Sequence, residues 1–168
     1  MKEKWINVFT LAFTVAALPP IWAVCSTYMG VTVGAVALIC AGLFACLGNN
    51  IKMAIPTSIG FLCGDIWAVI AVNVMAHLGL GPNATVYATL FVMGGLAVII
   101  GSVFEKFILV PAWLCGWAIG LTIMGPMDAS ALGTMPIQIG VAMLAGVWYV
   151  GIVGDLFQKF LIRLIRKN

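Results

Sequence analysis

Long runs of apolar residues, separated by short polar breaks, dominate this chain. Runs of about 20 apolar residues are long enough to cross a bilayer as helices. Six such runs follow one another: Trp5–Val24, Tyr28–Leu47, Ala54–Ala76, Ala84–Val103, Phe107–Met124 and Met135–Val153. The breaks between them contain Gly, Asn, Pro and charged residues, as in "LGNN" and "GLGPN". The pattern predicts an all-α polytopic membrane bundle of six transmembrane helices over residues 1–154.

The composition strengthens this prediction. The chain is 64% hydrophobic and only 8% charged, and its mean hydropathy is +1.18. A soluble domain carries about 25% charged residues, because its surface is solvated by water. This composition excludes a soluble globular domain and indicates an integral membrane protein in contact with lipid.

The basic residues predict the orientation of the six helices. They lie before the first run, in the breaks after the second and fourth runs, and after the sixth: Lys2, Lys4, Lys52, Lys106, Lys159, Arg163, Arg166 and Lys167. With six spans, all of them fall on one side of the membrane. The positive-inside rule makes that side the cytoplasm, so we expect both termini there.

The segment 155–168, "DLFQKFLIRLIRKN", is predicted to be a separate amphipathic tail. Leu156, Phe160 and Leu164 recur at helical spacing, with basic residues at other positions. Such a helix lies on the cytoplasmic leaflet and attracts anionic lipids. Docking against a soluble protein is the alternative.

Small residues recur every four positions in several runs. Helices in lipid associate where small residues let their backbones approach. The ladders are Gly60, Gly64 and Ala68; Ala112, Gly116 and Gly120; and Gly30 and Gly34, continued by Ala37, Ala41 and Ala45. They predict tight helix interfaces and a homo-oligomer.

Short matches around tryptophan suggest an internal repeat. "IWAV" occurs at Ile21–Val24 and Ile66–Val69, and the "LCG" before the second copy returns in "LCGWAIG" at Leu114–Gly120. Tryptophan therefore recurs in the first, third and fifth runs. The spacing suggests three related helical hairpins. Three parallel hairpins would lack the inverted symmetry of many transporters.

Asp65 stands in the middle of the third run, near the expected bilayer midplane. A carboxylate there costs roughly 2.5–3.5 kcal/mol, so it should face the bundle interior. No Lys or Arg lies within the runs to pair with it. On the same helix, Ser58 and Asn73 extend a sparse polar track. Asp65 is either a group in a solute or proton pathway, or a structural residue bonded to a neighbouring helix or subunit.

Three tryptophans are candidates for lining the same path. Trp67 and Trp117 lie near mid-depth, where the interfacial role of tryptophan does not apply. They either form a narrow aromatic constriction or fill the core. Trp22 joins them as a candidate path residue, or belongs to the outer interfacial belt.

Catalytic and metal-binding patterns are missing from the sequence. Its five cysteines show no C-x-x-C pair or zinc spacing, and no phosphate-binding glycine loop or nucleophile–base pair can be assembled. We therefore expect no enzyme activity, no cofactor, no metal and no nucleic-acid partner.

The chain resembles the small YcdZ-like bacterial inner-membrane proteins, a domain of unknown function. The resemblance rests on Ile21–Trp22, "FAC" at Phe44–Cys46, Gly64 with Trp67, and "FILVP" at Phe107–Pro111 followed by Cys115. It implies a multi-pass protein of the bacterial inner membrane without an assigned substrate, and it transfers no functional residues. The YcdZ-like pattern has an apolar residue where Asp65 stands.

These observations together favour a channel or transporter for a small polar, neutral solute such as urea, ammonia or a short amide. A buried carboxyl without a partner cation favours neutral solutes or protons over anions. Two alternatives stay open: a non-transporting scaffold or accessory subunit, and a proton- or cation-coupled carrier that uses Asp65.

Overall fold

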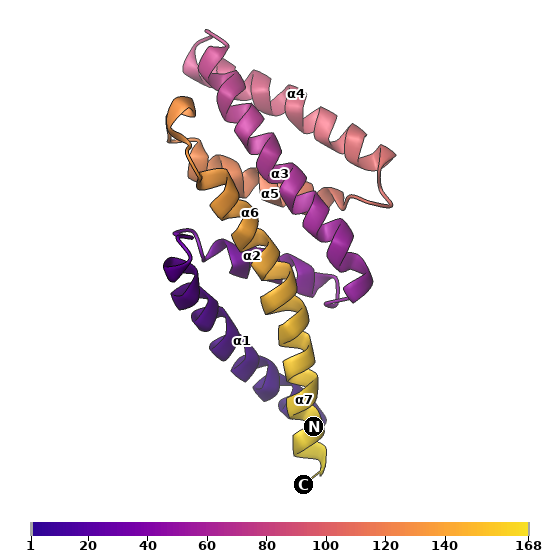
Figure 1. Cartoon of the computed structure of the whole chain (residues 1–168). Coiled ribbons are helices and arrows are strands. Elements are labelled where there is room, and N and C mark those ends of the chain that lie inside the picture. The colour runs from indigo at the N-terminus through magenta and orange to yellow at the C-terminus, as the bar shows by residue number, and fades with distance from the viewer. Residues whose placement is uncertain (1, 168) are drawn as a thin grey trace.

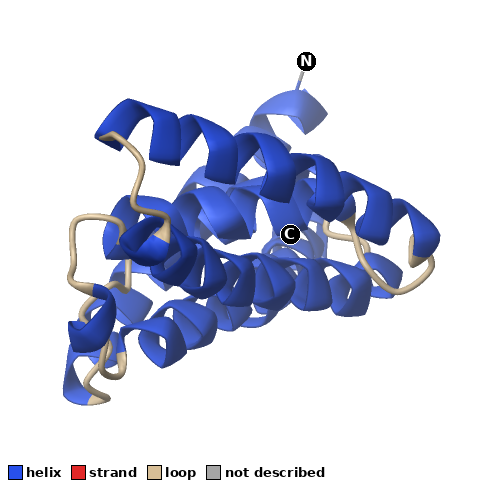
Figure 2. Cartoon of the chain, turned by 90° about the horizontal axis from the view of Figure 1, so that it is seen from above, coloured by secondary structure: helices blue, strands red, loops and turns tan. Residues whose placement is uncertain are grey.

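The structure is a computed structural model that describes residues 2–167, and every regular element in this part is helical (Figures 1 and 2). Its elements are α1 (Lys2–Tyr28), α2 (Val36–Cys46), α3 (Ile51–His77), α4 (Pro82–Val103), α5 (Val110–Met124), the 3-10 turn η1 (Ala129–Ala131), α6 (Met135–Ala145), the π-helix η2 (Gly146–Val153) and α7 (Gly154–Lys167). The elements α6, η2 and α7 follow one another without a break, and together they are called the sixth helix below.

Four helices are long and apolar enough to cross a membrane: α1, α3, α4 and the sixth helix. This indicates a membrane protein, although the prediction of six full-length spans was too simple. The second and fifth runs form helices of only 11 and 15 residues, or about 17 and 23 Å against a hydrocarbon core of about 30 Å. Gly30, at φ +76, and the turns up to Ala35 delay the start of α2.

Successive helices alternate in direction. In Figure 1 the connections that follow α1, α3 and α5 lie toward the upper left, and those that follow α2 and α4 lie toward the right. The short helices α2 and α5 run across the longer ones. Figure 2 shows the loops at the sides of the molecule, with helices filling its middle.

The amphipathic tail is helical, as predicted, but it is not a separate element. The helix α7 continues directly from η2 and packs along α1 (Figure 1). Arg166 pairs with Glu3 at 3.0 Å, and the rings of Phe157 and Phe13 lie 6.3 Å apart. Phe157 of α7 therefore faces α1, whereas Leu156, Phe160 and Leu164, which recur at helical spacing, stay exposed. Contact of α7 with anionic lipid stays a prediction.

The expected three hairpins are not the packing units of this fold. The short helix α5 packs most extensively on α3, while α2 packs on η2 and α6. Each short helix thus packs on the last long helix of the other half of the chain. The outer helices follow the same rule, since α4 packs on α3 and α1 packs on α7. The units are two halves, α1–α2–α3 and α4–α5–sixth helix.

Each helix of the first half has a counterpart in the second half. Within each such pair, a constant difference in residue number relates the buried residues of one helix to those of the other. Buried Thr10, Thr14 and Ser26 of α1 correspond to buried Thr85, Thr89 and Gly101 of α4. Buried Val36, Ala37, Cys40, Ala41 and Phe44 of α2 correspond to buried Ala112, Trp113, Gly116, Trp117 and Gly120 of α5. Buried Thr57, Ser58, Gly60, Phe61, Gly64 and Asp65 of α3 correspond to buried Ile139, Gly140, Ala142, Met143, Gly146 and Val147 of the sixth helix.

Equivalent residues make equivalent contacts. A β-carbon on Gly64 would collide with the Trp113 carbonyl oxygen, and one on Gly146 would collide with the carbonyl oxygen of Ala37, the equivalent of Trp113. The two halves each contain three helices, so corresponding helices run in opposite directions. The fold is a pair of inverted repeats, which the expectation of parallel hairpins had excluded.

Many large apolar side chains are exposed on the outer helices. On α1 and α4 these include Phe9, Phe13, Phe91, Ile99 and Val103. An apolar surface of this extent is unsuited to water but matches the hydrocarbon of a bilayer. The structure therefore supports contact with membrane lipid.

Candidate functional site at the junction of α3, α5 and α6

The crossing of α3 and α5 brings two backbones into contact. A β-carbon on Gly60 would lie 2.6 Å from the Leu109 carbonyl oxygen, and one on Gly116 would lie 2.5 Å from the Phe61 carbonyl oxygen. Neither helix could approach so closely if these positions carried side chains. The small-residue ladders of both runs thus form this interface within one chain, and the homo-oligomer predicted from them stays a prediction.

Asp65 lies where this crossing meets α6. Its side chain is 5% exposed. A β-carbon on Gly120 of α5 would lie 3.5 Å from Oδ1, and one on Gly140 of α6 would lie 3.7 Å from Oδ2. The carboxyl group therefore occupies space that two glycines leave open, between three helices and at the seam between the two repeats.

The carboxyl group has no compensating partner among residues 2–167. Its Oδ1 atom is buried and accepts no hydrogen bond from the described residues. The ion pairs of the described chain join Lys159 to Asp155 and Arg166 to Glu3, in its terminal parts. Among the described residues, no three His, Cys, Asp or Glu side chains lie close enough to share a metal ion. A buried polar atom without a partner is costly, so this carboxyl group is a candidate binding group for a proton, a water molecule or a polar solute.

Ser58 lies two turns from Asp65 on α3 and also faces the sixth helix. It is buried, and its Oγ accepts a 3.0 Å hydrogen bond from the Trp148 indole N–H in η2. Ser58 and Asp65 therefore share the seam between the repeats, as their spacing had suggested.

The predicted aromatic constriction does not surround Asp65. Trp67 donates its indole N–H to the Met93 carbonyl oxygen of α4 at 3.1 Å, and its ring meets the ring of Trp113 edge-on, with centroids 5.4 Å apart. The Trp117 ring lies against Gly94 of α4. Residues two apart on a helix point about 200° apart, so Trp67 faces α4 while Asp65 faces α6. The tryptophans fill the space between α3, α4 and α5.

Two further candidates lie away from the junction. Asn73 is exposed and donates to the Val69 carbonyl oxygen of its own helix at 2.8 Å. Trp22 donates to the Gly34 carbonyl oxygen at 3.0 Å, at the meeting of α1 with α2. The structure thus brings Asp65 and Ser58 together on one seam and separates them from Trp67, Trp117, Asn73 and Trp22.

Sequence reasoning missed Gly120, Gly140 and Trp148. Gly120 stood in a recognised ladder, yet nothing in the sequence showed that it faces Asp65. Gly140 and Trp148 lie in the sixth run without any pattern that links them to α3. Only the packing of α6 and η2 against α3 brings them to the site.

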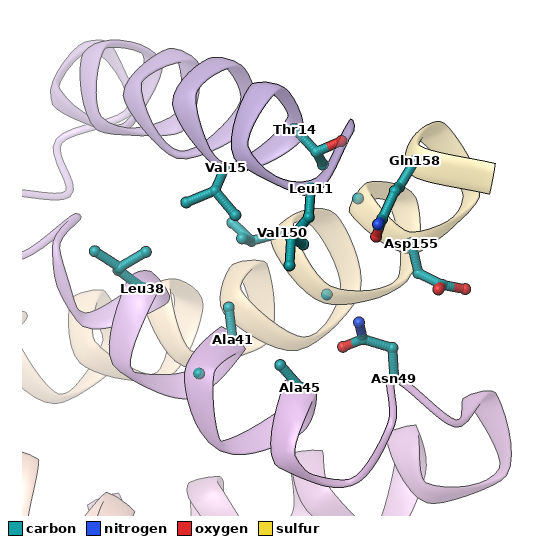
Figure 3. Close-up of a pocket in the computed structure, with 13 residues that line it drawn as sticks. Leu11, Thr14, Val15, Leu38, Ala41, Ala45, Asn49, Val150, Asp155 and Gln158 are labelled. Atoms are coloured by element: carbon teal, nitrogen blue, oxygen red, sulfur yellow. The ribbon is translucent and has the colours of Figure 1, made fainter. Parts of the chain in front are cut away.

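A cavity of about 210 Å³ lies away from the Asp65 junction, between α1, α2 and the sixth helix. Figure 3 shows Leu38, Ala41 and Ala45 of α2 opposite Leu11 and Val15 of α1. The polar side chains of Asn49, Asp155 and Gln158 gather at one end of the cavity (Figure 3). The π-helix borders it through Val150 and Gly151, and π-helical segments are frequent at functional sites.

Comparison with known proteins gives a family but no activity. The family model described as "Protein of unknown function (DUF1097)" matches residues 12–159. No curated protein and no solved structure matches the chain. The narrower resemblance to YcdZ-like proteins stays a prediction. The match covers most of the chain, including α2 to α6 and the Asp65 junction, so the chain belongs to the DUF1097 family of proteins of unknown function.

Proposed function

We propose that this protein transports a small polar, uncharged solute across the bacterial inner membrane, with Asp65 as the central polar group. Urea, ammonia and short amides are the solutes of this class to test first. In this proposal the protein is not an enzyme, both termini are cytoplasmic, and assembly into a homo-oligomer is compatible with the exposed apolar helices.

The observation that carries the proposal is the buried, unpartnered carboxyl group at the seam of two inverted repeats. Many membrane transporters are built from inverted repeats, and their substrate sites lie near the bilayer midplane where the repeats meet. Ionisable residues inside a membrane are costly and mark functional sites more often than structural ones. Both arguments support Asp65 as a transport residue.

The scaffold alternative receives less support. A carboxyl group that bonds subunits together would lie on the outer surface of the protomer. Asp65 faces Gly120 and Gly140 of its own chain instead. A proton-coupled carrier remains compatible with the same site, because an unpartnered carboxyl group can bind a proton during the cycle.

Flux into proteoliposomes tests the proposal. Stopped-flow light scattering would follow re-swelling under urea, acetamide and glycerol gradients, and a pH dye inside the vesicles would report an ammonia pulse. We expect flux of at least one solute well above that of empty liposomes. Asp65→Asn should lower this flux at least tenfold, because the amide nitrogen donates hydrogen bonds where a carboxylate oxygen accepts them from the solute.

Asn73→Ala is the matched control, because Asn73 is polar, lies on the same helix and is exposed. Its flux should match that of the unmodified protein. Rates equal to those of empty liposomes for every solute, with folded protein inserted, would refute transport of this solute class. Equal loss in both variants would refute a special role for Asp65.

A further inference from the structure

The two repeats differ at one equivalent place, and this difference suggests how the protein works. In the first half, a cavity of about 210 Å³ separates the middle of α1 from α2. In the second half, the Trp117 ring lies between α5 and α4, 3.7 Å from a β-carbon built on Gly94, one turn beyond Leu90, the equivalent of the cavity residue Val15. Trp117 corresponds to Ala41, whose small side chain lines the cavity.

We propose that the cavity is the cytoplasm-facing access site of a carrier, and that the space around Trp117 is its closed outward-facing equivalent. This rests on the proposed transport function and specifies it as alternating access. In inverted repeats, the arrangement seen in one half is available to the other, and exchanging the two arrangements opens the opposite side. In the exchanged state α1 closes on α2, and α4 moves away from α5.

Unpartnered polar groups support an alternative arrangement of the second half. Thr89 is 3% exposed, and its hydroxyl oxygen has no hydrogen-bond partner among the described residues. Its equivalent in the first half, Thr14, lines the cavity and donates to the Thr10 carbonyl oxygen at 2.8 Å. The indole N–H of Trp117 is also buried without a partner. Opening between α4 and α5 would supply both groups with water or solute.

The outward-facing site would lie one helical turn from the glycine of α5 that contacts Asp65. A β-carbon on Gly120 would meet both Ala68 and, at 3.5 Å, the Oδ1 atom of Asp65. Gly120 lies one turn from Trp117 on α5, so displacement of Trp117 would open a space on the α4 side of α5, one turn from the glycine that contacts the carboxyl group. Val147 of the sixth helix occupies the position equivalent to Asp65. Away from Asn49, Asp155 and Gln158, the lining of the cytoplasm-facing cavity is apolar apart from Thr14.

The cavity fits an uncharged solute with hydrogen-bonding groups. Its volume equals that of about seven water molecules in the liquid, at about 30 Å³ each. Asn49 and Gln158 offer amide groups at its polar end, and the Oδ1 atom of Asn49 accepts no hydrogen bond from the part of the chain that the structure describes. Asp155 is paired with Lys159 at 2.6 Å, so this pair adds no net charge. A small amide or an equally small polar, neutral molecule matches these groups.

Thiol labelling in oriented membrane vesicles tests the exchange without any assay of flux. The five native cysteines are replaced, and a single cysteine is introduced either at Ala45, which lines the cavity, or at its equivalent Leu121. A membrane-impermeant maleimide should label Ala45→Cys rapidly from the cytoplasmic side. It should label Leu121→Cys slowly from the outside.

The decisive variant is Ala41→Trp, which gives the first half the side chain that closes the second. It should slow labelling of Ala45→Cys at least tenfold and speed labelling of Leu121→Cys at least threefold. Trp117→Ala should speed labelling of Leu121→Cys at least tenfold. Ala41→Leu, a smaller change, should shift both rates in the same directions as Ala41→Trp if the larger residue prevents folding.

If these variants change only the labelling of their own half, the two spaces are independent and alternating access is refuted. The same holds if Leu121→Cys stays unlabelled from outside in every variant. Coupled labelling without flux of any tested solute would support alternating access and refute only the choice of solute class. Flux with uncoupled labelling would instead indicate a channel and overturn the carrier.

Discussion

Trp148 of η2 donates its indole N–H to the hydroxyl oxygen of Ser58 in α3 at 3.0 Å, across the seam between the two repeats. Both residues lie away from the polar termini, in helices that are apolar along most of their length. This bond therefore joins the long helices of the two halves within their apolar part. It also gives the indole N–H a partner, which Trp113 and Trp117 lack.

A double-mutant cycle would measure this bond. We expect Ser58→Ala and Trp148→Phe to be coupled by about 0.6 kcal/mol, and by no more than about 1.7 kcal/mol, as for other hydrogen bonds between helices in membranes. Reversible unfolding in mixed micelles gives the free energies. Fully additive effects of the two substitutions would show that the hydrogen bond contributes nothing to stability.

Gly64→Ala should destabilise the α3–α5 crossing by about 1–3 kcal/mol, because the added methyl group collides with backbone atoms that cannot move independently. Gly95→Ala is the control, since no atom lies within 4 Å of a β-carbon there and α4 is helical at this position. That change should be neutral or stabilising by up to about 1 kcal/mol. Thermal unfolding, monitored by size-exclusion chromatography, would distinguish the two variants. Equal melting temperatures for both would contradict the tight crossing of α3 and α5.

The orientation can be tested with cysteines at two exposed loop positions. Asn83→Cys lies at the start of α4, and Glu105→Cys lies in the connection between α4 and α5. In a protein whose five native cysteines are replaced, an impermeant maleimide should label only Asn83→Cys in intact cells if the basic residues face the cytoplasm. Labelling of Glu105→Cys alone would show that the protein has the opposite orientation in the membrane.

Anionic lipid should stabilise the protein through the exposed basic side of α7. Each Lys or Arg near an anionic surface contributes about 1 kcal/mol, and Arg163 is exposed. Arg163→Gln should therefore reduce the rise in melting temperature that phosphatidylglycerol produces, and added salt should reduce it further. Lys52→Gln, at the start of α3, is the comparison outside the tail. Equal responses to phosphatidylglycerol in the Arg163→Gln variant and the unmodified protein would show that Arg163 does not contact the lipid surface.

The helical membrane class could be predicted from the sequence, since it follows from composition and run length. All six apolar runs also form helices, at approximately the predicted positions. Two of them were shorter than their apolar runs, because hydropathy does not show where a glycine with positive φ or an irregular turn ends a helix. Here Gly30 and the segment 104–109 interrupt the helical structure.

The hairpin prediction was wrong because it followed the most conspicuous residues. Trp22, Trp67 and Trp117 do not occupy equivalent places: Trp117 corresponds to Ala41, and Trp22 corresponds to Ala97. The true equivalence lies in inconspicuous buried positions, such as Thr10 and Thr14 with Thr85 and Thr89. Side-chain size at these positions depends on the neighbouring helix, so the amino-acid sequences of the two halves show little similarity.

The amino-acid sequence alone was enough to indicate a helical membrane protein with one carboxyl group deep in its interior, because the cost of exposing apolar or charged groups to the wrong solvent depends on residue type. The direction in which each side chain faces came only from the tertiary structure. Asp65 and Trp67 are two residues apart, yet they face different helices and belong to different environments. Which helix covers which face depends on close contacts between distant glycines, and no local pattern specifies those pairings.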